Sequence, residues 1–457
     1  MIKVGIISLG CARNLLDSEV IAGSLKKQGL KIAGVGSGVD ICVINTCSFT
    51  GQAREESVDA ILEISQLKKE GRIKRIVVCG CLPQLYKEKL IDELPEVDLF
   101  LGSSDFPELP RLIKNLKGGK PRSHVSRAPN YLYSENTPRY MMTPSHYAYV
   151  KVSEGCCNHC SYCIIPRLRG TFRSRPINSV INEIKKLSVS GTLKEVNLIG
   201  QDTTLFGYDR YGKKRLPAGS KTFAWQAGLE ELLRRVCALK NSVEWIRILY
   251  THPAHYTNGL ISAISEEEKI CKYLDLPIQH ISDKVLKSMN RRTTGADISR
   301  LIEKLRKDIR GLVLRTSIIV GFPGETDRDF EELTAFMKET AFERCGAFIY
   351  SREEGTAAAK MKGQVPESVK RERFDCLMKL QQRISLSKNK RLIGRTVKVL
   401  IDDKTEGEKD IFEGRTQGDA PEVDGVAHVS GKNVKVGGFC DVRITEALEY
   451  DLVGKKV

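Results

Sequence analysis

Two long series of alternating β-strand and α-helix patterns run through this chain of 457 residues and restrict it to an α/β fold. In the first series, short β-branched runs alternate with helical patterns, at residues 4–8, 18–28, 39–45, 53–69, 76–78, 83–94 and 97–101. This alternation is typical of a doubly wound parallel sheet. The first series therefore predicts an open sheet with helices on both faces.

The second series begins near residue 147 and contains strand patterns of the same kind. Six of them recur with helical patterns between them, at residues 149–152, 195–199, 245–249, 272–276, 314–320 and 347–350. Six β/α repeats predict a partial TIM-like barrel, (β/α)6, in which chemistry takes place at the carboxyl ends of the strands. Residues 208–221 interrupt the series, and we expect them to form an exposed loop.

The remaining segments connect or follow these two series. We predict an N-terminal doubly wound parallel sheet domain at residues 1–117, a polar linker with several prolines at 118–146, and the barrel at 147–365. A long basic helical pattern at 366–393 leads into further strand patterns, at residues 396–401, 425–429, 434–436 and 440–444. Their short spacing predicts a small all-β barrel over residues 394–457.

The 14 cysteines limit the chemistry of the chain. Its longest apolar stretches fall short of the roughly 18 to 20 residues of a membrane span, and no signal-peptide cleavage pattern follows Met1. We therefore expect a cytoplasmic protein without membrane contact. Because thiols stay reduced in that compartment, we expect the cysteines to bind a metal or cluster, or to be buried, and not to form disulfides.

Three cysteines form a C-x3-C-x2-C run directly after the first strand of the predicted barrel, at Cys156, Cys160 and Cys163. Structural zinc sites take four ligands, commonly in paired C-x2-C units. Three thiolates on one short loop can instead hold three irons of a cubane cluster and leave the fourth iron open. The alternatives are three buried side chains or a zinc knuckle completed by His159; we favour the cluster and treat Cys157 as a bystander.

Cys11, Cys47 and Cys81 each follow shortly after a predicted strand of the first series. In open α/β sheets the ligand crevice lies outside the carboxyl ends of the strands, so these three thiols can converge at one edge. Singly, each would more often fill a core or loop. We assign Cys42 and Cys79 to the core, with Cys79 as the one rival ligand. The cysteines without a partner spacing are assigned to burial: Cys237, Cys271, Cys345, Cys376 and Cys440.

The C-x3-C-x2-C run resembles the signature of the radical S-adenosylmethionine (SAM) superfamily. The sequence motifs LGCARN at residues 9–14, NTC at 45–47 and GCLPQ at 80–84 extend this resemblance to the methylthiotransferases. The resemblance implies two 4Fe-4S clusters. The first, on Cys156, Cys160 and Cys163, binds SAM and cleaves it to a radical. The second, on Cys11, Cys47 and Cys81, carries or supplies sulfur.

The resemblance also implies where SAM lies, and it places Tyr162 against the adenine. Gln201 ends a strand where many radical SAM enzymes have a Gly-Gly-Glu motif that this sequence lacks; we assign it to SAM binding. Glu325 opens a helix at another strand end and is assigned to SAM as well, the alternative being that Thr326 forms a simple capping box. His280 follows the fourth strand and is assigned to the substrate, the alternative being a structural histidine. No catalytic residue is assigned beyond the cluster ligands.

Further sequence motifs indicate one branch of the methylthiotransferases. The words SLGC at residues 8–11, LDLPIQH at 274–280 and GRTQGDAPEVDG at 414–425 resemble the branch that modifies an aspartate of ribosomal protein S-12, and the tail resembles a TRAM domain. This implies methylthiolation of the aspartate β-carbon, with one SAM as methyl donor and another as radical source. The expected partners are S-12 or the small ribosomal subunit, and an electron donor of unknown identity. The alternatives are an adenosine in tRNA and a non-enzymatic iron-sulfur protein.

The charge distribution agrees with the protein substrate. The chain carries a formal +16, but residues 390–457 contain 12 Lys and Arg against 13 Asp and Glu, which leaves +17 for the body. A C-terminal domain that binds RNA should be basic. The acidic residues of this tail suit a basic ribosomal protein instead: Asp402, Asp403, Asp419, Glu422 and Asp424. The body could meanwhile face ribosomal RNA.

Overall fold

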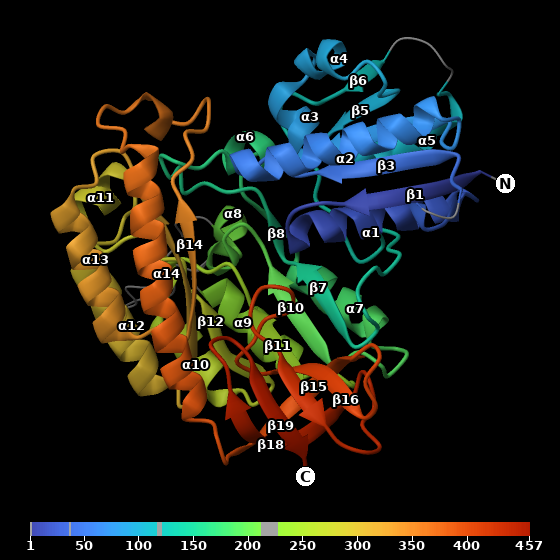
Figure 1. Ribbon diagram of the computed structural model, residues 1–457. Coiled ribbons are helices and arrows are strands. Elements are labelled where there is room, and N and C mark those ends of the chain that lie inside the picture. Colours follow the sequence, from blue (N-terminus) through green and yellow to red (C-terminus); the bar gives the residue numbers. More distant parts are fainter. Residues whose placement is uncertain (1, 36–37, 117–120, 212–226) are drawn as a thin grey trace.

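The computed structural model describes residues 2–35, 38–116, 121–211 and 227–457, which form three units (Figure 1). An α/β unit is followed by a barrel of parallel strands and by a small closed β-barrel. The predicted fold class is confirmed. Most of the loop expected at 208–221 lies outside the described residues, as does the start of the expected linker at residues 118–120.

The N-terminal unit is a six-stranded parallel sheet in the order β2-β1-β3-β4-β5-β6. Its helices cover both faces, with α1 and α5 against one apolar cluster and α2 and α4 against the other. The order reverses between β1 and β3, and a ligand crevice opens at such a switch point. The elements are β1 (Lys3–Ser8), α1 (Ala12–Lys27), β2 (Lys31–Ile32), β3 (Ile41–Thr46), α2 (Gly51–Lys69), β4 (Arg75–Gly80), α3 (Cys81–Tyr86), α4 (Lys89–Glu93), β5 (Leu99–Gly102), α5 (Leu109–Lys114) and β6 (Arg122–His124).

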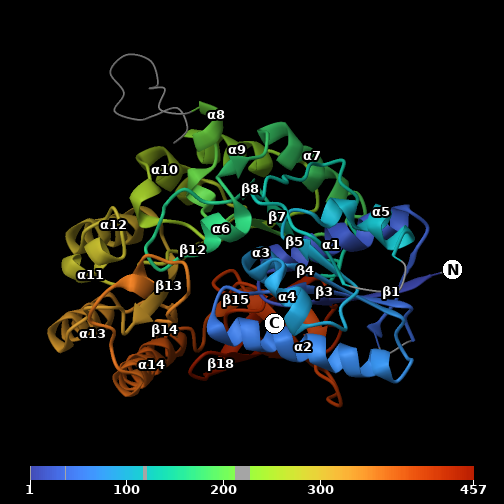
Figure 2. The same ribbon diagram turned by 90° about the horizontal axis from the view of Figure 1, so that it is seen from above.

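The central unit is an open barrel of six parallel strands in the order β14-β13-β12-β11-β10-β7. Its helices form an arc around the outer side of the strands (Figure 2). The elements are β7 (Tyr147–Lys151), β8 (Ser153–Glu154), α6 (Ile165–Arg169), β9 (Arg173–Ser174), α7 (Ile177–Leu187), β10 (Glu195–Ile199), α8 (Tyr208–Tyr211), α9 (Gly228–Cys237), β11 (Trp245–Ile248), α10 (Asn258–Glu266), β12 (Ile270–Asp275), α11 (Asp283–Ser288), α12 (Gly295–Asp308), β13 (Val313–Val320), α13 (Asp327–Thr340) and β14 (Arg344–Ile349).

Helix α14 (Glu367–Lys390) leads to the C-terminal unit, a closed barrel in the order β15-β16-β17-β19-β18. Its strands are β15 (Thr396–Lys404), β16 (Ile411–Thr416), β17 (Ala427–Ser430), β18 (Phe439–Ala447) and β19 (Leu452–Lys456). The sequence did not predict β16 or β19, whose glycines and charged residues weaken the strand pattern. The strand predicted at residues 434–436 is absent, because those described residues form a turn.

The segment expected to be a linker is instead packed between the first two units. It supplies β6, which pairs with β5 at the edge of the N-terminal sheet. Further along, Arg139 is buried and forms ion pairs with Glu19 of α1 and Glu183 of α7. The backbone N–H of Lys151 donates a hydrogen bond to Tyr133 Oη at 2.8 Å. This segment therefore does more than connect the two units, because its polar side chains also hold them together.

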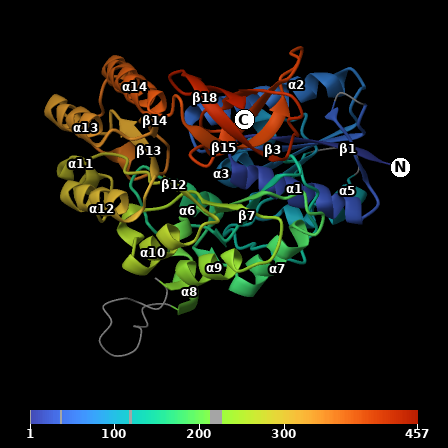
Figure 3. The same ribbon diagram turned by 90° about the horizontal axis from the view of Figure 1, so that it is seen from below.

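The outer two units occupy opposite ends of the central barrel (Figure 1, Figure 3). At the carboxyl end of β10, Arg13 of the N-terminal unit donates a hydrogen bond to the carbonyl oxygen of Gly200 at 3.1 Å. At the amino end of the same strand, Glu195 pairs with Arg415 of the C-terminal barrel, with Nη1 and Oε2 2.6 Å apart. The N-terminal sheet therefore faces the end of the barrel at which chemistry is expected.

Four of the five acidic residues that were read as a docking charge for a basic protein are engaged inside this chain. Asp419 pairs with Arg344 at 2.7 Å, and the hydroxyl of Tyr273 donates a hydrogen bond to Asp424 at 2.6 Å. In addition, Asp402 pairs with Arg415, and Glu422 accepts a hydrogen bond from Tyr147. The charge argument drawn from these residues is wrong, because they pair with buried arginines and accept hydrogen bonds from buried tyrosine hydroxyls of the same chain.

Among the residues that the structure describes, no helix combines the length and the apolar composition that a membrane span requires.

Candidate functional site

The N-terminal cysteines lie at the carboxyl ends of three neighbouring strands. Cys11 follows β1 and precedes the first residue of α1, Cys47 follows β3, and Cys81 is the first residue of α3 after β4. Gly10 has a φ of +90°, and a Cβ at this position would lie 2.6 Å from the Cβ of Cys47. Only glycine lets the chain pass so close, and the switch point of the sheet therefore gathers these thiols.

Two arginines face these thiols. The Nε of Arg13 donates to Cys11 Sγ at 3.5 Å, and Nη2 of Arg169 donates to Cys81 Sγ at 3.6 Å. Burial raises the pKa of Cys11, but the nearby guanidinium groups outweigh it and lower this pKa to about 7. Because iron binds the thiolate, both cations favour a ligand role for these cysteines.

The rival ligand Cys79 is buried in β4 within an apolar cluster, and burial raises its pKa. Cys42 is likewise buried in β3, in the cluster on the opposite face of the sheet. Both placements agree with a core role.

The barrel cysteines lie on one loop between β8 and α6. Several hydrogen bonds fix this loop: Asn158 Nδ2 donates to Asp202 at 2.7 Å, and Ser161 Oγ donates to the Ser288 carbonyl at 2.8 Å. His159 has a φ of 52° and is exposed, and Asn290 Nδ2 donates to its carbonyl oxygen at 2.8 Å. The loop thus presents Cys156, Cys160 and Cys163 from a rigid backbone, a form that suits a three-thiolate cluster site.

A cavity of about 280 Å³ is lined by residues close in sequence to both groups of cysteines, although no cysteine lines it. It is lined by residues of the N-terminal unit, the cysteine loop and the carboxyl ends of β11 to β14: Arg13, Phe49, Thr50, Tyr162, Tyr250, Asp275, Pro277, Gln279, Arg315, Ser317, Ile319, Phe348, Ile349, Tyr350, Ser351 and Glu353. Three of these residues lie within two positions of a cysteine in the sequence. Arg13 and Phe49 come two residues after Cys11 and Cys47, and Tyr162 comes directly before Cys163. The cavity can therefore present a small group to both cysteine sites.

Two non-glycine residues with left-handed backbone line this cavity. Tyr250 has a φ of 59° at the end of β11, and Gln279 has a φ of 71° after β12. Such conformations cost free energy and cluster at functional sites. Tyr250 was not singled out from the sequence.

The predicted SAM residues Tyr162 and Gln201 are placed near the cysteine loop. Tyr162 lines the cavity. The Nε2 of Gln201 donates to Glu154, while its Oε1 is buried without a hydrogen-bond donor among the described residues. A buried acceptor without a donor fits a polar ligand that supplies one.

Glu325 and His280 do not line the cavity. The Glu325 carboxylate pairs with Arg373 at 2.8 Å and accepts a hydrogen bond from the backbone N–H of Phe322. His280 is fully buried, and its Nδ1 accepts a hydrogen bond from the backbone N–H of Ser282 at 3.0 Å. Thr326 forms the capping box that was the alternative reading. These contacts do not support the assignment of Glu325 to SAM or of His280 to the substrate.

A buried charge network joins the two cysteine sites. The Nζ of Lys151 lies 2.7 Å from both Asp17 of α1 and Glu154 of β8. Arg169 of α6 also pairs with Asp17 and approaches Glu154. Burial raises the pKa of Glu154, but the two cations outweigh it and lower this pKa to about 2. The network is neutral in sum, and it ties the N-terminal unit to the strand that precedes the cysteine loop.

Asp202, His252 and His255 form a polar cluster that the sequence analysis missed. One ligand atom of each lies within 4.8 Å of the others. Asp202 also accepts hydrogen bonds from Asn158 and Thr204, and His252 Nδ1 accepts one from the backbone N–H of Ala254. The hydrogen bond from Asn158 joins this cluster to the cysteine loop. His252 and His255 lie three residues apart after β11, but this spacing alone does not show that Asp202, after another strand, lies beside them.

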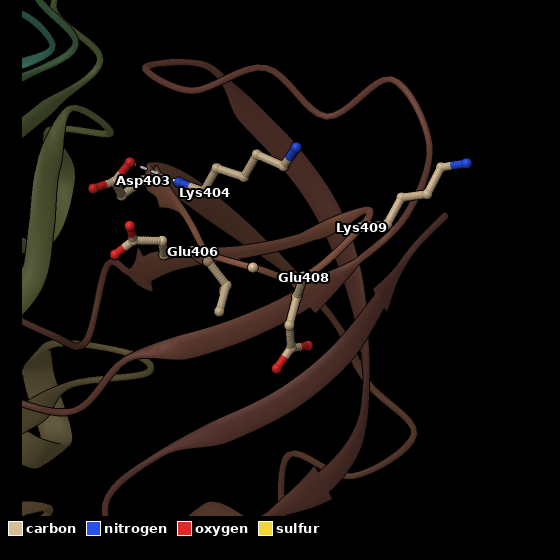
Figure 4. Close-up of a pocket in the computed structure, with 7 residues that line it drawn as sticks. Asp403, Lys404, Glu406, Glu408 and Lys409 are labelled. Atoms are coloured by element: carbon tan, nitrogen blue, oxygen red, sulfur yellow. Dashed lines mark hydrogen bonds between the residues drawn. The ribbon is translucent and has the colours of Figure 1, made fainter.

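A second hollow lies on the turn between β15 and β16 and is not a candidate site. It measures about 570 Å³ and is lined by residues 403–409. Its charged side chains are exposed and point in different directions (Figure 4). They do not converge on one point, so they do not define a binding centre.

Comparison with known proteins agrees with this division of the chain. The model of the radical SAM superfamily matches residues 150–337, that of "Uncharacterized protein family UPF0004" matches residues 3–102, and that of the TRAM domain matches residues 393–457.

Two full-length relatives bear the same name, "Ribosomal protein uS12 methylthiotransferase RimO". The protein of Geotalea uraniireducens is 45% identical over 455 residues, which cover 100% of this chain and 98% of the relative. The protein of Clostridioides difficile is 43% identical over 458 residues, which cover 99% and 98%.

Solved structures share the fold at low sequence identity. The radical SAM methyltransferase TsrM from Kitasatospora setae has a TM-score of 0.53 and 15% identity, over 76% of this chain and 73% of that one. The cobalamin-dependent radical enzyme OxsB has a TM-score of 0.51 and 12% identity, over 84% of this chain and 56% of that one.

Proposed function

Since this chain belongs to the ribosomal protein uS12 methylthiotransferases, a family of radical SAM enzymes, we propose that it replaces a hydrogen on the β-carbon of a uS12 aspartate with a methylthio group. The observation that carries this proposal is the cavity whose lining comes from the N-terminal unit, the loop of the barrel cysteines and the barrel strands. A reaction that joins radical formation to sulfur transfer needs one substrate position within reach of both centres.

The enzyme uses SAM and two 4Fe-4S clusters. In this proposal Cys156, Cys160 and Cys163 hold the first cluster, and Cys11, Cys47 and Cys81 hold the second. The donor sets fit, because each provides three thiols on a fixed backbone and leaves one iron position to another ligand. When bound, these groups supply the SAM-derived radical, the methyl group and the sulfur.

In this proposal the side chains around the cluster sites bind and orient SAM and the protein substrate. Tyr162 offers a flat apolar face in the cavity, and the buried Oε1 of Gln201 offers an acceptor; we assign both to SAM. Phe49 and Phe348 remain 45% and 50% exposed, although both line the cavity. Two exposed aromatic rings at one opening suit the docking of a protein loop.

The partners follow from the reaction. uS12 is the substrate, free or within the small ribosomal subunit, and the basic body of the chain supports an approach to ribosomal RNA. An electron donor is required to reduce the first cluster. We place the reaction in the cytoplasm, where ribosomal proteins are made.

An adenosine in tRNA is not favoured as substrate. The relatives compared above are named for uS12 and align over their full length.

The proposal is tested by anaerobic reconstitution with iron and sulfide, followed by SAM and a strong reductant. uS12 or unmodified tRNA is offered, and both are analysed by mass spectrometry. We expect uS12 to gain the mass of one methylthio group minus one hydrogen, localised to an aspartate. The same gain on an adenosine of tRNA, with none on uS12, would overturn the proposal.

A further inference from the structure

Arg13 is held on three sides at the wall of the cavity. Its Nε donates to Cys11 Sγ at 3.5 Å, its Nη1 donates to the Gly200 carbonyl at 3.1 Å, and its Cζ lies 4.2 Å from the ring centroid of Tyr250. These contacts come from both units. They fix the plane of the guanidinium, while the side chain is only partly buried and lines the cavity.

The other charged groups of the cavity already have partners. Arg315 lies 3.1 Å from Asp275 and 3.3 Å from Asp424. Glu353 is paired with Arg54, which does not itself line the cavity. These pairs use both carboxylates that line it.

Arg13, by contrast, has no carboxylate within 4.0 Å among the residues that the structure describes, and its Nη2 makes no hydrogen bond to any of them. A guanidinium in a confined space is stabilised by an anion, and a carboxylate matches its planar fork of donors. The sulfur of Cys11 satisfies only Nε. The cavity therefore holds one cation with a free donor edge.

We propose that Arg13 binds the side-chain carboxylate of the substrate aspartate and thereby selects an acidic residue over a neutral one. This inference rests on the proposed function and names the residue that recognises its substrate. The β-carbon of an aspartate is bonded to its carboxyl carbon. A carboxylate held by Arg13 consequently brings the reacting carbon to the side of the cavity where Cys11 lies.

SAM carries a carboxylate too, and Arg13 contacts Gly200, the residue before Gln201. The shared chemistry is a carboxylate on a guanidinium fork. We assign it to the substrate because Arg13 belongs to the N-terminal unit, at Cys11, and not to the loop of Cys156, Cys160 and Cys163 that would hold SAM.

The test measures how Arg13 discriminates a carboxylate from an amide. Full-length enzyme with both clusters reconstituted is kept oxidised with SAM and without reductant, so that binding occurs without turnover. The dissociation constant is measured for uS12 and for uS12 with its target aspartate changed to asparagine. We expect wild-type enzyme to bind the asparagine form about tenfold to a hundredfold more weakly, and Arg13→Gln to bind both forms equally.

Arg167→Gln is the matched control, because it removes the same charge at an exposed residue that does not line the cavity and has no ion pair among the described residues. This variant should keep the full discrimination. Arg13→Lys should keep part of it, because an ammonium retains the charge without the fork. If Arg13→Gln fails to fold or to load iron, Arg13→Lys carries the test, and undiminished discrimination in that variant overturns the inference.

Other outcomes separate the inference from the proposed function. Full discrimination in Arg13→Gln contradicts the inference, and weaker SAM binding with the discrimination intact assigns Arg13 to the SAM carboxylate. Failure of wild-type enzyme to bind uS12 counts against the proposed function itself. Iron and sulfide contents of each variant show whether its clusters are present.

Discussion

Arg169 in the helix after the radical cysteine loop donates a hydrogen bond to the sulfur of Cys81, 3.6 Å away in the N-terminal unit. The same guanidinium pairs with Asp17 and contacts Asn14. One side chain of the central barrel thus supports a cysteine of the other cluster site. The surroundings of the N-terminal cysteines are therefore built from both units.

Arg169→Gln should therefore damage the second cluster site from a distance in sequence. It leaves Asp17 with only Lys151 as a cationic partner and removes the cation beside Cys81. We expect a loss of about 3 to 5 kcal/mol in the free energy of unfolding and lower iron content after reconstitution. Arg167→Gln is the control, because Arg167 lies on the same helix and is exposed. Equal urea-unfolding midpoints and iron contents for the two variants would contradict the network.

The ligand assignment predicts a difference between neighbouring cysteines. Cys81→Ala should lose the second cluster and methylthio transfer while SAM is still cleaved to deoxyadenosine. Cys79→Ala should keep both clusters, because Cys79 is a core residue of β4. Iron content, electron paramagnetic resonance and product analysis check both variants. Loss of the second cluster in Cys79→Ala would make Cys79 the ligand instead.

Changing the radical-loop cysteines should have the opposite effect. Cys156→Ala, Cys160→Ala and Cys163→Ala should each abolish SAM cleavage, because an open iron held by three thiolates is needed to bind SAM. Cys157→Ala should retain cleavage, since Cys157 lies in an apolar cluster with Phe172 and Leu205. A chromatographic assay of deoxyadenosine measures SAM cleavage in each variant. Cleavage retained in the first three variants would refute the assignment of these cysteines as cluster ligands.

The sequence predicted most of the fold because strand and helix periods are local. The eight residues of β13 alternate between partly exposed and buried, as a pleated strand does. The placement of Cys11, Cys47 and Cys81 at one edge of the sheet was also predictable, since each follows a strand and parallel strands end at one edge. Strands β16 and β19 were missed because the closed barrel, and not an apolar pattern, stabilises them.

Contacts between distant residues could not be predicted in this way. Arg169 and Asn14 are 155 positions apart, and no period relates them. The end of a strand also does not fix which side chain faces the site: Gln279 lines the cavity, whereas the adjacent His280 is buried. The acidic tail was misread for a similar reason, because composition cannot show that Asp419 faces Arg344.

The contact between the C-terminal barrel and the central unit gives a further prediction. Asp419 and Arg344 are both buried and lie 2.7 Å apart. Asp419→Ala leaves a buried guanidinium without its carboxylate, so we expect a loss of about 3 to 5 kcal/mol in unfolding free energy. Asp403→Ala should change it by less than about 0.5 kcal/mol, since Asp403 is exposed. Urea unfolding measures both, and equal effects would show that the tail acts as surface charge after all.

The buried His280 predicts an acid sensitivity of the fold. Burial lowers its pKa from 6.5 to about 4, so the unfolded chain binds a proton between these values and the folded chain does not. Stability therefore rises with pH across this window, and wild-type protein should lose about 1.6 kcal/mol from this residue between pH 6.5 and pH 5. His280→Asn retains an acceptor for the N–H of Ser282 but has no proton to bind, so its unfolding free energy should fall less over the same interval. Urea unfolding of both proteins at the two pH values checks this, and parallel losses would mean that His280 does not titrate as its burial requires.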